Sequence, residues 1–227
     1  MNLARRILRN EIVELLVGPQ KELLRVHKLL LCNKVPYFAK MFQGGFKDAK
    51  ESRASFPEDT AESFGLLIEW IYTGIVRPLG YKTTGPRHHT YDMVAFYVLA
   101  ENICAFDLAD NILEAYRVHQ VTKNKHPAIW CTKHAYNKTE AGSPLRRYCA
   151  GSLIYVFVTN KVVPNPWPTK ELSDLMGDVE DFRKDFLFRL RTVSVSPPVH
   201  LTDPRYAHIC DYHWHGKTDV CPVKKAS

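Results

Sequence analysis

The chain has 227 residues and a formal net charge of +7, from 31 basic and 24 acidic residues. Hydrophobic residues make up 45% of it and charged residues 24%, the balance of an ordinary globular protein, which excludes disorder throughout. Its 11 glycines and 14 prolines are too few for a collagen-like or low-complexity chain. The longest apolar run, near residues 153–158, is far shorter than the roughly 18–20 residues that span a bilayer, so no membrane segment is expected.

The strands come first. Residues 12–17 and 22–26 are short, apolar and β-prone, and the Gly-Pro that opens residues 18–21 favours a turn between them. These three segments predict a β-hairpin. Residues 51–56 are predicted to form a third strand.

Helices follow the hairpin. Apolar residues at helical spacing predict five of them, at 28–33, 36–43, 59–74, 93–100 and 108–116. Asp59 followed by Glu62 has the form of a capping box, which begins the third helix, and Gly74 ends it. A hairpin followed by helices with little strand between them predicts an α+β fold.

The second half is expected to be helical as well. After Lys123 the composition turns polar, and Pro127 marks a boundary. Ser143-Pro144 begins one helix, and a last amphipathic helix carries its apolar stripe on Val179, Phe182, Phe186 and Leu190. The predicted division is an N-terminal extension at 1–9, a first domain at 10–124, an all-helical extension at 125–192 and an irregular tail at 193–227.

The tail contains a compact group of metal-binding residue types. Cys210, His213, His215 and Cys221 form the pattern C-x2-H-x-H-x5-C. Cysteine thiolates and histidine nitrogens are the ligands that tetrahedral zinc prefers, so one interpretation is a structural zinc ion, while the other is a polar tail without metal. Cys131 and His134 form a second, more isolated C-x2-H pair.

The cysteines and the beginning of the sequence predict a reducing compartment. Six cysteines are scattered without a tight disulfide framework, and the first ten residues lack the apolar region of a secretory signal. A cytoplasmic or nuclear protein is therefore expected. The basic residues are spread singly between apolar positions, with no interleaving of arginines and aromatics, so direct nucleic-acid binding is not expected.

Residues 17–74 resemble a known family. The matching segments, in order, are Val-His-Lys at 26–28, LLLC at 29–32, Pro-Tyr-Phe-Ala at 36–39, Gly-Gly-Phe-Lys at 44–47, Phe-Pro-Glu-Asp at 56–59 and Glu-Trp-Ile-Tyr-Thr-Gly at 69–74. Their order and spacing resemble a BTB/POZ domain of the type found in filamentous fungi. The helices at 91–119 resemble the end of that domain, and residues 145–191 resemble the helical extension that follows it in fungal members.

The resemblance implies a BTB/POZ fold, a small sheet flanked by helical hairpins, followed by an all-helical extension and an irregular tail. It also implies a non-catalytic protein–protein interaction module whose partners are a second copy of itself or a cullin-type scaffold. Adaptor work for a cullin-type ubiquitin ligase is the leading role. Asn10-Glu11 stands where most members have Ser-Asp, an acidic group of the dimer interface in many of them, and the N-terminal segment is also short; a swapped-strand dimer is therefore not expected.

Two aromatic residues are the candidates for an interaction surface. Trp70 and Tyr72 lie on other faces of the 59–74 helix than its apolar stripe, and exposed large aromatics are favoured contacts in interfaces. His27 is interpreted as a strand-end residue that hydrogen-bonds the backbone, with a titrating binding-site residue as the alternative.

An enzyme is not expected, because no nucleophile elbow, zinc-protease motif or phosphate-binding glycine pattern is present. The alternative function is a nuclear or transcriptional regulator, or a homodimeric scaffold, with a zinc-bound tail.

Overall fold

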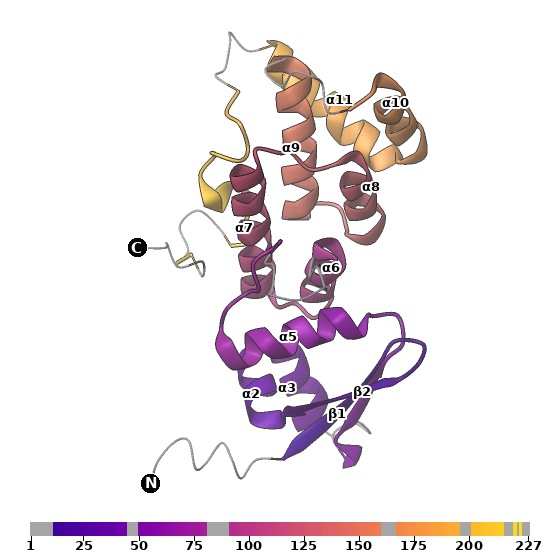
Figure 1. Ribbon diagram of the computed structural model, residues 1–227, viewed down its shortest axis with the longest axis vertical. Helices are drawn as coiled ribbons and strands as arrows, with labels where there is room; N and C mark the ends of the chain where they lie inside the picture. The colour runs from indigo at the N-terminus through magenta and orange to yellow at the C-terminus, as the bar shows by residue number, and fades with distance from the viewer. Residues whose placement is uncertain are drawn as a thin grey trace. The chain divides into compact units, whose positions relative to one another are not determined.

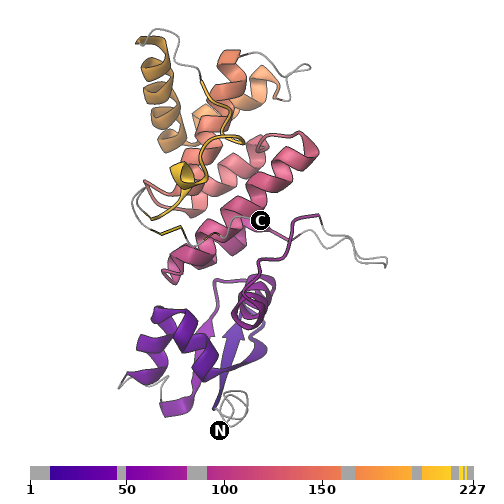
Figure 2. The same ribbon diagram turned by 90° about the vertical axis from the view of Figure 1, so that its left-hand side faces the viewer.

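A computed structural model describes most of the chain, with several gaps. The described residues are 11–44, 50–80, 91–159, 167–195, 201–215, 220–221 and 223. The chain divides into two compact units, residues 1–112 and 113–227, which are drawn in Figures 1 and 2. The predicted extension at 1–9 lies outside the described residues. Within the described part, no helix has both the length and the apolar character needed to cross a membrane.

The first unit is built on a three-stranded sheet. The predicted hairpin is present: β1 (Ile12–Val17) pairs antiparallel with β2 (Glu22–His27), with Leu16 opposite Leu23. Gly18 takes a left-handed φ of +76° in the turn, a conformation that glycine adopts without steric cost. β3 (Arg53–Phe56) lies parallel to β1 on its other side, which gives the sheet order β2-β1-β3.

Helices cover the apolar face of this sheet. α2 (Lys28–Lys34), α3 (Pro36–Gln43) and α5 (Ala61–Thr73) begin and end close to their predicted positions. Side chains alternate along β1, so Val13, Leu15 and Val17 are buried. An aromatic row then joins α3, β3 and α5, because the Phe56 ring packs against the rings of both Phe38 and Phe64.

The start of α5 differs by one residue from its prediction. The helix is capped by Thr60, whose hydroxyl accepts a hydrogen bond from the Ser63 amide at 3.1 Å, and not by Asp59. A hydroxyl at this position satisfies a first-turn amide, as the carboxylate of the predicted capping box would have done. The end of the helix is as predicted, since Gly74 has a φ of +74°.

Two further helices complete the described part of the first unit and lead into the second. α6 (Met93–Asn102) begins at Asp92, whose carboxylate accepts from the Ala95 amide at 3.0 Å, and it contacts α5. α7 (Phe106–Lys123) contains the point at which the two units divide. This small sheet with its surrounding helices confirms the predicted α+β class.

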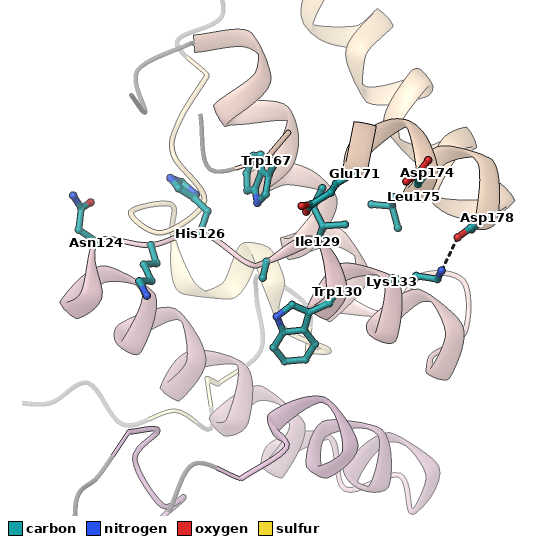
Figure 3. Close-up of a pocket in the computed structure, with 12 residues that line it drawn as sticks. Asn124, His126, Ile129, Trp130, Lys133, Trp167, Glu171, Asp174, Leu175 and Asp178 are labelled. Atoms are coloured by element: carbon teal, nitrogen blue, oxygen red, sulfur yellow. Dashed lines mark hydrogen bonds and ion pairs between the residues drawn. The ribbon is translucent and has the colours of Figure 1, made fainter. Parts of the chain in front are cut away.

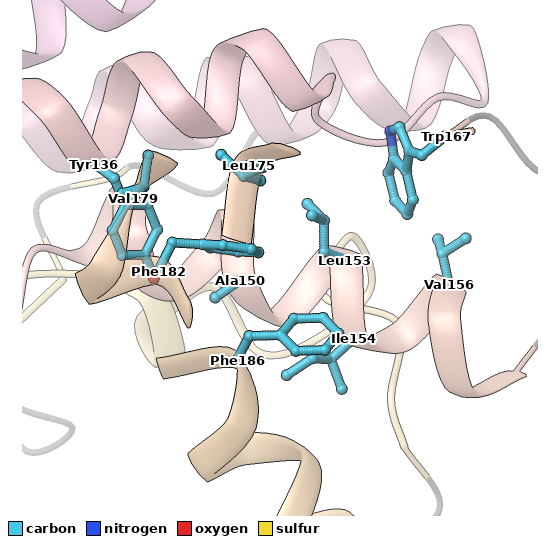
Figure 4. Packing of buried hydrophobic residues seen from close by; sticks show 10 residues of the cluster. All are labelled: Tyr136, Ala150, Leu153, Ile154, Val156, Trp167, Leu175, Val179, Phe182 and Phe186. Atoms are coloured by element: carbon cyan, nitrogen blue, oxygen red, sulfur yellow. The ribbon is translucent and has the colours of Figure 1, made fainter. Parts of the chain in front are cut away.

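The second unit is helical. Its helices after α7 are α8 (Ile129–Lys138), α9 (Pro144–Thr159), α10 (Thr169–Asp178) and α11 (Glu180–Val195). Its core consists of side chains from all four of them, and Figure 4 shows their packing around Phe182 and Phe186. The Phe182 ring lies 5.3 Å from the Tyr136 ring in an edge-to-face arrangement. Phe182 and Phe186 belong to the apolar stripe predicted for the last helix.

The sequence pattern did not predict α8 or α10. α8 buries Tyr136 together with Cys131, Thr132 and Ala135, so its buried face combines one aromatic residue with small or polar side chains and has no continuous apolar stripe. α10 buries only Leu175. It follows a proline-rich stretch, which predicts an interruption of helical structure. Both helices are stabilised by packing against neighbouring helices. This contribution cannot be predicted from the helical periodicity of the sequence.

Candidate metal centre and interaction surface

The C-terminal segment lies against the helices of the second unit. We call residues 201–215 the strap; apart from the short 3₁₀ helix η1 (Ile209–Tyr212) it has no regular structure. Arg117 of α7 donates from Nη1 to the carbonyls of Arg205 and Ala207, at 2.9 and 3.0 Å. Arg205 is itself buried and paired with Asp203 at 2.7 Å. The strap is therefore held by charged groups at its beginning.

Aromatic packing holds the other end of the strap. The Tyr212 ring lies 5.4 Å from the Tyr148 ring of α9, edge to face. Next to it, Gly151 of α9 leaves room for the strap, because a Cβ at that position would lie 3.2 Å from the Tyr212 hydroxyl and 3.5 Å from Pro204 Cγ. Arg147 of α9 also donates to the carbonyl of His213 at 3.1 Å. These contacts hold residues 204–213 of the strap against α9, and this stretch carries Cys210 and His213 of the Cys/His group.

Replacing Gly151 by alanine tests this close approach. In most helix positions, glycine to alanine stabilises by about 0.5–1 kcal/mol, since alanine has less backbone entropy to lose. At Gly151 the added methyl meets Tyr212, so we expect no gain or a net loss of stability. Gly177→Ala in α10 is the matched control, because a Cβ there meets nothing within 4 Å. Urea unfolding of the two variants measures the difference, and equal gains would show that the strap does not pack on α9.

The four predicted metal-ligand residues lie together. Cys210 is in η1, His213 ends it, and His215 and Cys221 complete the group, with one ligand atom from each residue all within 4.8 Å of one another. His213 Nδ1 is 3.0 Å from His215 Nε2 and 3.6 Å from Cys221 Sγ. Ligand atoms around tetrahedral zinc lie roughly 3.3–3.8 Å apart, given Zn–N of about 2.0–2.1 Å and Zn–S of about 2.3 Å. The group can therefore hold a metal ion with little rearrangement.

Electrostatics favour the neutral form of the most buried ligand. Burial, with smaller contributions from nearby His215, Arg117 and His208, lowers the pKa of His213 to about 4. Its imidazole is therefore neutral near pH 7, with a lone pair available to a metal. Two thiolates also balance the double charge of a divalent cation, so this donor set suits a closed site without an open position for catalysis.

The second C-x2-H pair has a different environment. Cys131 is buried in α8, and its thiol lies 3.4 Å from the Tyr116 hydroxyl. Cys149 is close to it and fully buried, and the hydrogen bond with Cys131, together with burial, raises the pKa of the Cys149 thiol. Both cysteines are buried core residues, and the Cys149 thiol is protonated near neutral pH.

The two aromatic residues predicted for an interaction surface differ in solvent exposure. Trp70 is only 8% exposed, so the expectation that it is exposed is wrong. The reason is that α5 packs against α2, α6 and β2, which buries more of the helix than its apolar stripe, and the Lys34 ammonium lies 4.5 Å from the Trp70 ring. Tyr72, in contrast, is 48% exposed.

Tyr72 lies at the end of β2. Its hydroxyl accepts a hydrogen bond from the backbone amide of His27 at 3.2 Å and also contacts His27 Nδ1. His27 pairs with Ile12 in the β1–β2 register, and Ile12 is 43% exposed. We call Ile12, His27 and Tyr72 the strand-end patch. His27 thus has the strand-end position that the sequence predicted, but among the described residues the contact of its ring is with a side chain, the Tyr72 hydroxyl, and not with the predicted backbone group.

A cleft in the second unit was not predicted from the sequence. It has a volume of about 560 Å³ and lies between α8, α10 and residues 124–128 (Figure 3). Trp130 lies at the edge of the cleft and is 68% exposed. Both ring nitrogens of His126 are buried and have no hydrogen-bond partner among the described residues. Burial, with a smaller effect of Arg205, lowers the pKa of His126 to about 4. The signal in the sequence was the short apolar run at residues 127–131, which contains Trp130.

Comparison with known protein families gives a match within the first unit. Residues 10–92 match the BTB/POZ domain family. They contain the hairpin, β3 and the helices α2, α3 and α5 described above. BTB/POZ domains are in general non-catalytic and mediate protein–protein interaction, by self-association or by binding other proteins. The match, the sheet and its covering helices agree: this chain contains a BTB/POZ domain at residues 10–92.

Proposed function

We propose that this protein is a substrate adaptor whose BTB/POZ domain binds a cullin-type scaffold of a ubiquitin ligase. The observation that carries the proposal is the strand-end patch within the BTB/POZ domain. Ile12 and Tyr72 are large side chains more than two-fifths exposed, and Tyr72 is held in place by His27. A preorganised aromatic loses little entropy on binding, which makes it a suitable anchor in an interface of about 1,200–2,000 Å².

Further features support an adaptor. The chain has a second compact unit, so one part can bind the scaffold while the other binds a substrate. We propose that the helices within residues 125–192 are the C-terminal helical extension of the fungal type. This role places the protein in the cytoplasm or the nucleus.

The strand-end patch is tested by replacing Tyr72 with glutamate. A charge in place of this exposed aromatic anchor is expected to weaken binding of the purified cullin N-terminal region at least tenfold, about 1.4 kcal/mol or more. Calorimetric titration of the full chain measures this, with unfolding midpoints of each variant recorded alongside. Tyr206→Glu is the matched control, because Tyr206 is 64% exposed and lies in the second unit.

The possible outcomes separate the candidate partners. Absence of cullin binding by the wild-type chain contradicts the adaptor role. If Tyr72→Glu instead shifts the wild-type chain from dimer to monomer in sedimentation, the patch serves self-association, and the homodimeric scaffold is the better description. Equal losses in the Tyr72 and Tyr206 variants would mean that the patch is not the contact surface.

We also propose that Cys210, His213, His215 and Cys221 hold a structural zinc ion. Support comes from the donor set, the short separations of the four ligand atoms and the burial of His213. The ion would join the end of the strap to residue 221 and so keep the strap on α7 and α9. Its role is structural, because four protein ligands leave no position for a reacting water.

A further inference from the structure

A second cavity lies in the C-terminal unit. It has a volume of about 510 Å³, within the range of ligand pockets, and is formed by α9, α11 and the strap. Leu201, Thr202, Pro204 and Tyr212 of the strap make one wall. The cavity therefore exists only while the strap is docked. We call it the strap pocket.

The charge of the strap pocket is predominantly positive. Arg146, Arg147 and Arg189 line it, against one carboxylate, that of Asp185. Arg146 is paired with Asp181 at 3.1 Å, so its charge is balanced outside the pocket. Among the described residues, no carboxylate forms an ion pair with Arg147 or Arg189.

The two remaining arginines are placed to bind an anion. Within the described part of the chain, Arg147 donates only to neutral carbonyls, those of Gly142 at 2.8 Å and His213 at 3.1 Å, which hold its guanidinium in position. Arg189 lies near Tyr212: burial raises the pKa of Tyr212, and the charge of Arg189 opposes that rise. A guanidinium presents a planar set of donors that fits a carboxylate with two parallel hydrogen bonds.

The rim of the pocket offers apolar contact as well. Phe188 lines it and is 73% exposed, and Ile154, Val193 and Leu201 contribute further apolar surface. Exposed aromatics beside arginines are enriched in protein interfaces. A small free anion would leave this apolar surface uncovered, whereas a peptide with acidic and apolar side chains covers both parts.

We infer that the strap pocket is a docking site for an acidic peptide segment of a partner protein, with its carboxylates on Arg147 and Arg189 and an apolar side chain on Phe188. If the protein is the proposed adaptor, this partner is the substrate of the ubiquitin ligase; only that identification rests on the proposed function. The pocket belongs to the second unit, so its binding is measured in the absence of any cullin.

The test is selection of peptides on the purified full-length chain, loaded with zinc, from a displayed library of random twelve-residue peptides. We expect the selected peptides to be enriched in aspartate and glutamate next to an aromatic or aliphatic residue. A synthetic peptide of the most enriched sequence is then titrated against variants. Arg189→Glu is expected to weaken its binding at least tenfold and Arg189→Gln by a smaller factor.

Arg191→Glu is the matched control, because Arg191 is exposed on the same helix and does not line the pocket. It is expected to change the affinity less than twofold. Unfolding midpoints of all variants show whether each remains folded. The inference is overturned by selected peptides without acidic enrichment, by no selected peptide, or by equal effects at positions 189 and 191. Displacement of the peptide by an equal concentration of inorganic phosphate would also overturn it, because the site would then bind a small anion.

Discussion

Removal of the zinc ion proposed for the Cys/His group is expected to lower the thermal unfolding midpoint of the second unit by about 10 °C or more. A ligand present at 1,000 times its dissociation constant stabilises the folded state by about 4 kcal/mol. In a unit of this size, each kcal/mol corresponds to about 4 °C. The effect should be confined to the second unit, because all four ligands belong to it.

The physical reason is the connection between the cluster and the strap. Without a metal, two thiols and two imidazoles are held within 4.8 Å of one another and no ion joins residue 221 to η1. Loss of the strap would then uncover Tyr148 and the helix surface at Gly151. A metal ion bound by these four residues would thus stabilise packing well beyond their own side chains.

Elemental analysis and calorimetry with and without a chelator measure the effect. The purified chain should contain one zinc ion per molecule, and Cys221→Ser and His215→Ala should each lose it and unfold at a lower temperature. Cys104→Ser is the control, because Cys104 is an exposed cysteine of the first unit. A metal-free wild-type chain that zinc does not stabilise would contradict the proposed centre.

Truncation of Phe182 to alanine is expected to destabilise the second unit by about 3–5 kcal/mol. Phe182 is fully buried, and its ring packs against those of Tyr136 and Phe186. Deleting a buried phenyl ring removes its transfer free energy and leaves a cavity that the neighbouring helices fill only in part. Since domains are stable by about 5–15 kcal/mol, this is a large part of the total.

Hydrogen exchange measured by mass spectrometry locates the change. In Phe182→Ala, protection should fall across α8 to α11, while β1, β2 and α5 keep theirs. Phe188→Ala is the matched control: it removes the same atoms from the same helix, but Phe188 is 73% exposed, so a change within about 0.5 kcal/mol is expected. Similar losses in the two variants would show that the cluster around Phe182 is not the core of this unit.

Local patterns of the sequence determined most of the first unit. The Gly18 turn, the alternation along β1, Pro36 at the start of α3 and Gly74 at the end of α5 each depend on one residue and its neighbours. Such signals are readable because backbone conformation and side-chain period are local properties. The four Cys/His residues were also found from spacing, since metal ligands combine distinctive residue types over a short stretch.

Tertiary structure decided the features that depend on contact between distant segments. Trp70 is buried because α5 has neighbours on several sides, and α8 is a helix although most of its buried side chains are small or polar. The strap pocket joins α9 and α11 to residues 201–212, and nothing local relates Arg147 to Arg189 or Tyr212. Burial and cavity shape are properties of the packed chain, whereas turns, caps and ligand spacing are properties of a few consecutive residues.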